Sequence, residues 1–345
     1  MSASDPAWPD NLIRLETIRL DQLRGRDVSQ DIVILPLAPI ENHGTHLPAG
    51  TDIYITDDLA LRMGRKFAER HSGTRVLLYP TISVGAATIR GTGSFKVSSR
   101  QLRNSLRFLS KRFFKQGYRR YVFVSGHGGV GHIGALDSAC AYLRGKGAEA
   151  IAPCASAVMK AYRGLYIPHC RETGVAWPDN LEFLFSNDLH AGWIETSMML
   201  RLRPDLVSPD FTSVPPLFAK KYWWLSGLER FIVAVAGRLP ISEETKAQVA
   251  IGAHVGALDL SWIIQGRLDG YHGAPALASA EAGEVILDVV TTDMAESMEH
   301  VFVHETQGVH GPSSAYLFKR LGWAVASLIL IASALAWIAM ETGAP

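Results

Sequence analysis

Short apolar runs alternate with helical stretches in the first half of the chain, and this alternation limits the possible folds more than any other feature. The apolar, partly β-branched runs lie at residues 31–38, 75–80, 120–125 and 148–153. Stretches with helical periodicity separate them, at residues 57–70, 99–116 and 133–146. Continuous apolar strands that alternate with helices are typical of parallel sheets covered on both sides. We therefore expect an α/β fold, with a parallel sheet flanked by helices on both faces.

The composition is that of a folded protein without a polyanionic partner. Of the 345 residues, 48% are hydrophobic and 19% are charged, which argues against disorder. The formal net charge of +1 gives no support for binding nucleic acid. The three cysteines, Cys140, Cys154 and Cys170, form no C-x-x-C pair, so we expect reduced core thiols.

The twenty residues from Leu321 to Met340 carry no charged side chain. A helix of this length spans about 30 Å, the thickness of the hydrocarbon core of a bilayer. Trp323 and Trp337 lie near its two ends, where indole rings favour the membrane interface. We predict a membrane helix at 321–340, after a linker at 307–320 and a catalytic domain at 1–306. An apolar helix buried in an oligomer interface is the alternative.

The basic pair Lys319–Arg320 precedes this apolar segment. Positive residues favour the cytoplasmic side, so we expect a single-pass C-terminal anchor with the catalytic domain in the cytoplasm. A second apolar stretch, residues 220–239, is aromatic with interspersed basic residues. It is interpreted as a partly buried helix, with a membrane-surface segment or the mouth of the active site as alternatives.

Three segments concentrate the residue types that bind metals. The first, residues 39–52, directly follows a predicted strand and contains Glu41, His43 and Asp52. Glu41 and His43 are two residues apart, so both leave the same face of an extended backbone. Carboxylates and imidazoles together suit zinc, manganese or iron(II).

The other two segments add two histidines and one glutamate. His127 lies among glycines at the end of a predicted strand, in Ser125-Gly-His-Gly-Gly129. His190 and Glu195 lie five residues apart at a predicted junction of loop and helix. A single histidine or acidic residue in a loop is more often a surface or capping residue. A cluster of ionisable groups without a cation is unfavourable, so their joint presence at strand ends predicts a metal site.

The three motifs together resemble those of the creatininase (creatinine amidohydrolase) family. The order and spacing of Glu-x-His-Gly-x-His-Leu-Pro-x-x-Thr-Asp, Gly-His-Gly-Gly and His-Ala-Gly-x-x-Glu-Thr-Ser agree with it over roughly residues 8–200. The resemblance implies one α/β domain, often assembled into homo-oligomers. It also implies hydrolysis of a C–N bond in a small amide or cyclic amide by water activated at two divalent metal ions.

Carried over residue by residue, the resemblance implies that Glu41 and His127 bind one metal ion and His43 the other. Asp52 would bridge the two ions. Creatininase takes a further carboxylate from the position of Gly129, so we expect Glu195 to complete the second site in its place. His190 would be the proton donor or acceptor, and His46 would orient a ligand.

The chain departs from the family pattern near the expected pocket. Asn42 replaces a common Gln, Val130 replaces Asn, and Arg90 replaces Pro before Gly91. We expect Arg90, Trp177 and Trp193 to line the substrate pocket, and we expect a substrate other than creatinine. Two alternatives stay open: a hydrolase of a non-amide cyclic substrate of the keto-sugar type, and a non-catalytic, membrane-tethered binding protein.

Overall fold

The computed structural model describes residues 8–304, except 90 and 267–268. The predicted linker and membrane helix, together with Arg90 of the predicted pocket, therefore lie outside the described residues. The boundaries proposed at 306 and 320 stay predictions for the same reason.

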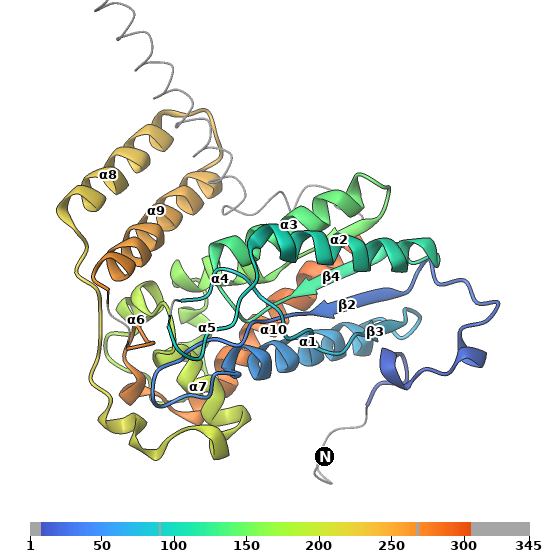
Figure 1. Ribbon diagram of the computed structural model, residues 1–345, viewed down its shortest axis with the longest axis horizontal. Coiled ribbons are helices and arrows are strands. Elements are labelled where there is room, and N and C mark those ends of the chain that lie inside the picture. Colours follow the sequence, from blue (N-terminus) through green and yellow to red (C-terminus); the bar gives the residue numbers. More distant parts are fainter. Residues whose placement is uncertain (1–7, 90, 267–268, 305–345) are drawn as a thin grey trace, which may run out of the picture.

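A parallel sheet forms the centre of the described chain (Figure 1). Its strands are β1 (Leu12–Arg14), β2 (Ile32–Pro36), β3 (Val76–Leu78), β4 (Arg120–Val124) and β5 (Glu149–Ile151). They pair in the order β1-β3-β2-β4-β5, and every pair is parallel. All five residues of β2 are buried, as expected for a central strand covered on both faces. The predicted fold class is thereby confirmed.

Helices cover both faces of this sheet. On one face, α2 (Ser99–Lys115) packs against α3 (Val130–Arg144). On the other face, α1 (Thr51–Arg70) packs against α7 (Trp193–Leu202) and α10 (Ala280–Phe302) (Figure 1). Three shorter helices complete this body: α4 (Cys154–Tyr162), α5 (Ile167–Glu172) and α6 (Leu181–Asn187).

Helix α1 begins earlier than the sequence pattern predicts. The expected start was residue 57, whereas the helix begins at Thr51, whose hydroxyl donates to the carbonyl of Pro48 at 2.7 Å. This local bond ends the loop before the acidic residues at which the sequence pattern predicts the start of the helix. Asp52 therefore lies in the first turn of a helix, which fixes its carboxylate more firmly than a loop would.

A helical hairpin, α8 (Trp223–Arg238) and α9 (Glu243–Ile264), stands apart from the sheet (Figure 1). The sequence predicts a partly buried helix at residues 220–239. The structure has helix α8 within this range, and its buried residues are Leu225 and Ala236. Helix α9 was not predicted. Within the described chain, α9 is long and apolar enough to cross a membrane, a test that the core helix of a soluble protein also passes.

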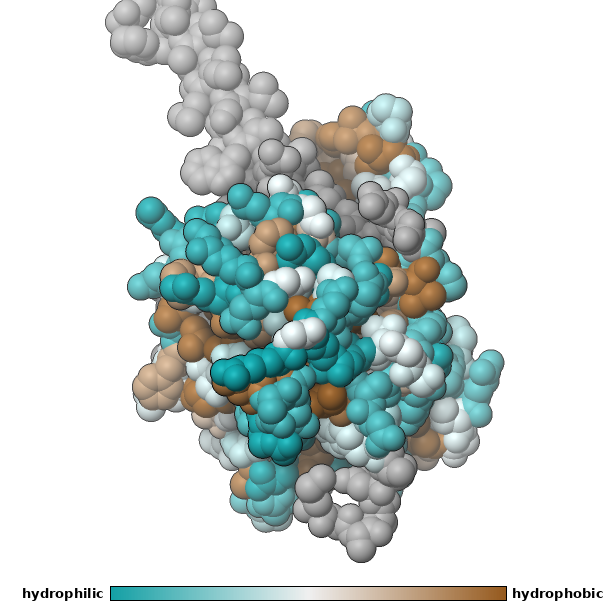
Figure 2. Space-filling view, turned by 90° about the vertical axis from the view of Figure 1, so that its right-hand side faces the viewer, coloured by the Kyte–Doolittle hydropathy of each residue, from teal (hydrophilic) through white to brown (hydrophobic). Residues whose placement is uncertain are grey.

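Two short antiparallel bridges hold the base of this hairpin. His190 pairs with His272, and Leu217 pairs with Gly273, through backbone hydrogen bonds of 2.7–3.2 Å. The residues that enter and leave the hairpin therefore lie side by side. Figure 2 shows the side of the molecule that lies at the right of Figure 1, away from the hairpin. Its surface is mainly hydrophilic, with apolar residues scattered among the polar ones.

Candidate metal centre and active site

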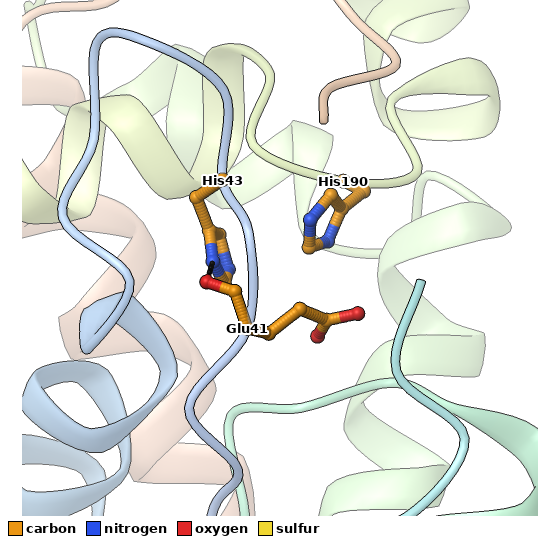
Figure 3. Close-up of side chains that lie close together, drawn as sticks. All are labelled: Glu41, His43 and His190. Carbon is orange, nitrogen blue, oxygen red and sulfur yellow. Dashed lines mark hydrogen bonds between the residues drawn. The ribbon is translucent and has the colours of Figure 1, made fainter. Parts of the chain in front are cut away.

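The predicted metal ligands meet beyond the carboxyl ends of β2 and β4, where α/β sheets commonly bind ligands. Glu41 and His43 follow β2, and His127 follows β4. Glu195 lies in the first turn of α7, after the loop that carries His190. Figure 3 shows Glu41 and His43 on one loop, facing His190 from the loop opposite.

One group of ligand atoms comes from Glu41, Asp52 and His127, whose side chains are all buried. Nδ1 of His127 lies 3.0 Å from Oε2 of Glu41 and 3.2 Å from Oδ2 of Asp52. Two carboxylates and one imidazole thus converge on one point from a loop, a helix and a strand end.

A second group comes from His43, Asp52 and Glu195. Nε2 of His43 lies 3.3 Å from Oδ1 of Asp52 and 3.7 Å from Oε2 of Glu195. The two oxygens of Asp52 therefore face different groups, Oδ1 toward His43 and Oδ2 toward His127. A carboxylate that faces two ligand groups is suited to bind a pair of metal ions.

With both imidazole rings neutral, the atoms that face inward have no hydrogen-bond partner. They are Oε2 of Glu41, Nε2 of His43 and both carboxylate oxygens of Asp52. Buried polar atoms are normally paired. These four atoms therefore indicate that the site binds a partner from outside the chain. The donor set, carboxylate oxygens and imidazole nitrogens, fits divalent zinc, manganese or iron.

The outward atoms of the same side chains are fixed by the backbone. Nδ1 of His43 donates to the carbonyl of Glu41 at 2.9 Å, and Nε2 of His127 donates to the carbonyl of Ala86 at 3.1 Å. Each bond leaves the other ring nitrogen free to bind a cation, which is the usual support of a metal-binding histidine. The amide of Ile89 donates to the second oxygen of Glu41.

Without a cation, protons occupy this cluster. Burial lowers the pKa of His43, but the carboxylates of Asp52 and Glu195 outweigh burial and raise the pKa to about 9. Burial likewise opposes a charge on His127, and the carboxylates of Asp52 and Glu41 raise its pKa well above the usual value. Burial raises the pKa of Asp52, and the two imidazoles bring it well below the usual value. A metal ion must therefore displace protons to bind.

His190 lies beside both groups. Its Nε2 donates to the carbonyl of Asn42 at 2.8 Å, and its ring centroid lies 4.3 Å from that of His43. One ligand atom of His190 also lies within 4.8 Å of ligand atoms of Glu41 and His43. With Nε2 held by a carbonyl, a neutral ring has Nδ1 as its acceptor. The ring is thus placed to move a proton.

His46 connects the first loop to the segment that carries Glu195. Its Nε2 donates to the carbonyl of Ala191 at 2.8 Å, and the amide of Ala191 donates to Oε2 of Glu195. Ala191 has a φ of 47°, a conformation that non-glycine residues rarely adopt. The contact with His46 supports this backbone conformation, and through it the position of the carboxylate.

No side chain fits at Gly129, the position for which the resemblance implies a carboxylate. A Cβ atom there would lie 2.5 Å from Nε2 of His127 and 2.7 Å from the carbonyl of Ala87. Glu195 instead reaches the group of His43 and Asp52. The expected replacement is consistent with this geometry.

The two tryptophans of the predicted pocket lie elsewhere, which corrects that expectation. Trp193 is fully buried and packs against Phe185 and Trp177, at centroid distances of 5.5 and 6.1 Å. Nε1 of Trp177 donates to the carbonyl of Cys170. Trp193 therefore belongs to the core, the half-buried Trp177 packs against it, and neither indole lines the cavity described next. Sequence alone did not show which side of the segment faces inward.

A cavity of about 840 Å³ opens above the metal-binding groups. Glu41, His127, His190 and Glu195 line one end of it. Its wall also includes side chains of α8 and α9 that the sequence did not point to, among them Asp259 and Trp262. The ring of Trp262 lies 5.9 Å from that of His190. No motif marked these residues, because nothing in the sequence shows that α9 folds over the site.

His132 is another residue that the motifs did not reveal. It is fully buried, and its Nδ1 accepts a hydrogen bond from the amide of Ala86, whose carbonyl holds His127. Burial, with a smaller effect of His127, lowers the pKa of His132 to about 3. A neutral His132 therefore supports the backbone behind a predicted ligand. The signal in the sequence is its position in the first turn of the helix that follows the second motif.

Comparison with known proteins gives the family. The model of the family described as creatininase, creatinine amidohydrolase, matches residues 16–298. The chain belongs to the creatininase family. The expected class, a metal-dependent amidohydrolase, agrees with the description of this family, while the activity of this chain, its substrate and the bond that it cleaves are proposals.

Two curated proteins have 30% sequence identity with the chain. Both are mycofactocin precursor peptide peptidases, from Mycobacterium ulcerans and from Mycolicibacterium smegmatis. Each match covers 52% of this chain and 61% of the relative. The chain therefore spans about three-fifths of the length of these relatives.

Solved structures agree on the fold. A structure described as Creatininase Mn has a TM-score of 0.54 and 19% identity, and it covers 84% of this chain and 98% of its own. A putative creatinine amidohydrolase from Bacteroides fragilis has a TM-score of 0.56 and 21% identity, over 85% and 97% of the two chains. At these identities the likeness concerns the fold alone.

Proposed function

We propose that the chain hydrolyses a C–N bond of an amide or peptide at a centre of two divalent metal ions. The observation that carries this proposal is Asp52, whose two oxygens face two separate ligand groups. Glu41 and His127 would hold one ion, His43 and Glu195 the other, and Asp52 both. When bound, such ions lower the pKa of a water molecule toward neutrality and polarise the substrate carbonyl.

The side chains around the centre supply the proton transfers. His190, held by the carbonyl of Asn42, would take a proton from the attacking water and give it to the departing nitrogen. His46 would keep Glu195 in place through Ala191. The names of the curated relatives, which are peptide peptidases, support an amide substrate over a cyclic keto-sugar.

Removal and return of metal test this proposal. Purified protein should hold two ions per chain by mass spectrometry, lose amide hydrolysis after treatment with a chelator, and regain it with manganese or zinc. Release of amine from short peptides and N-acyl amino acids would be measured beside opening of a keto-sugar lactone. Activity that persists in metal-free protein, or that acts on the lactone alone, would contradict the proposal.

The membrane anchor is a separate proposal. The uncharged run at 321–340 supports it. Deletion of residues 318–345 is expected to move the protein from the membrane fraction to the soluble fraction with its activity intact. A full-length chain that stays soluble would oppose an anchor, and a truncated chain that misfolds would assign the segment to the core or to an oligomer contact.

A further inference from the structure

The wall of the cavity opposite the metal-binding groups is apolar. The hairpin contributes a set of aliphatic side chains to it: Leu225, Leu228 and Ile232 from α8, and Val255, Leu260 and Ile263 from α9. Ile89, Ile133, Val158 and Met159 of the body face the same space. Away from the metal-binding groups most of the lining is therefore hydrocarbon, although Lys96, Tyr162, Glu229 and Asp259 also line the cavity.

The charged side chains of the hairpin that reach this wall do not make it a polar site. Glu229 is already paired, because Nζ of Lys221 lies 2.7 Å from it and His254 lies 3.3 Å from it. Asp259 is the other acidic residue of the wall, at the side where His190 lies. A substrate that fills the cavity therefore meets apolar side chains over most of its length.

The size of the cavity also exceeds what a compact amide needs. Its volume of about 840 Å³ lies in the upper part of the range of about 300–1,000 Å³ for small-molecule sites. Each methylene group that moves from water into such a wall raises affinity about fourfold. An aliphatic chain of several carbons would therefore contribute more to binding than the amide itself.

We infer that the cavity selects amides that carry an aliphatic acyl chain, which packs between α8–α9 and the body while the amide faces the metal-binding groups. The position of the amide rests on the proposed function, whereas the apolar wall does not. The hairpin has two different faces in this respect. Ile232 lines the cavity, and the neighbouring Phe231 is 65% exposed on the outside.

The experiment compares N-acetyl-, N-hexanoyl- and N-dodecanoyl-glycine with the metal-loaded, full-length protein. Binding is measured by calorimetry and hydrolysis by release of glycine. We expect kcat/KM to rise at least about tenfold from the acetyl to the hexanoyl compound, with affinity rising in parallel. Equal affinity and equal kcat/KM across the series would overturn the inference.

Two neighbouring substitutions separate the cavity from the outer surface. Ile232→Asp should abolish the dependence on chain length, while Phe231→Asp should leave it unchanged. If Ile232→Asp does not fold, Leu228→Asp tests the same wall at a position that is already 48% exposed. An equal effect of Phe231→Asp would mean non-specific adsorption and would overturn the inference.

These readouts also separate the inference from the proposed function. Chain-length-dependent binding without any hydrolysis would leave the inference standing and defeat the proposed function. Hydrolysis of N-acetylglycine that equals that of the longer compounds would support the proposed function and defeat the inference.

Discussion

The metal-binding end of the cavity and the α8–α9 wall are built in opposite ways. At the metal-binding end, His43 and Asp52 are almost fully buried, and backbone groups fix the outward nitrogens of His43 and His127. In the wall, half-exposed aliphatic side chains have no directional partners. Fixed polar groups determine which bond can react, whereas an adaptable apolar wall determines which molecules bring that bond there. The two properties can therefore change independently.

Replacement of Asp52 should have the largest effect, because both ligand groups share this carboxylate. Asp52→Asn is expected to reduce metal content to less than one ion per chain and kcat/KM by at least about 10³-fold. Asp57→Asn, in the same helix, is the control, since Asp57 accepts a hydrogen bond from Thr81 and belongs to none of the metal-binding groups found among the described residues. Retention of two ions in Asp52→Asn, measured by mass spectrometry, would show that the two groups are not coupled.

Replacement of His190 separates proton transfer from metal binding. His190→Gln should lower kcat by about 10²- to 10⁴-fold with metal content unchanged, as expected when a general acid–base is lost. His169→Gln, an exposed histidine of α5, should change neither quantity. Loss of an ion from His190→Gln would instead make this histidine a ligand, in the group that it forms with Glu41 and His43.

Two glycine substitutions compare the tolerance of the two regions. In Gly192→Ala, the new Cβ would lie 1.7 Å from Oδ1 of the buried Asp188, so unfolding free energy should fall by about 1–3 kcal/mol or more. In Gly227→Ala, inside α8, the new Cβ would have no neighbouring atom of the described residues within 4 Å. Alanine is favoured over glycine inside a helix, so the free energy of unfolding should rise by about 0.5–1 kcal/mol. Equal effects in denaturant titrations would contradict the difference in packing.

The smallest effect concerns protons. The pKa of His43 is raised to about 9, so without metal the ring is a positively charged imidazolium at neutral pH. It must lose one of its two ring protons when an ion binds. Apparent metal affinity should therefore rise with pH and level off above about 9, by up to about tenfold per pH unit for this group. Titrations in buffers of different ionisation enthalpy would measure the released proton. A metal affinity that does not change between about pH 6 and about pH 8 would contradict this prediction.

The sequence predicted the sheet and the metal-binding residues because both depend on short-range patterns. Apolar runs locate strands, and Glu41, His43 and His127 follow strands whose carboxyl ends must meet at one edge. The early start of α1 escaped prediction because it depends on one local bond of Thr51. The apolar wall of the cavity was not predicted for a different reason. Apolar residues occur all around α9, so their periodicity does not show which side of this helix faces the cavity. The same ambiguity put Trp193 in the pocket when it belongs to the core.

The paired backbone bridges at the base of the hairpin have one further consequence. Because Leu217 and Gly273 are already paired, the 55 residues between them, 218–272, form a loop that leaves and rejoins the catalytic body at one point. Lengthening such a loop twofold changes the closure free energy by only about 0.6 kcal/mol. The α8–α9 hairpin could therefore be lengthened, shortened or replaced in evolution without moving the metal-binding residues. One catalytic body could in this way acquire cavities for different substrates.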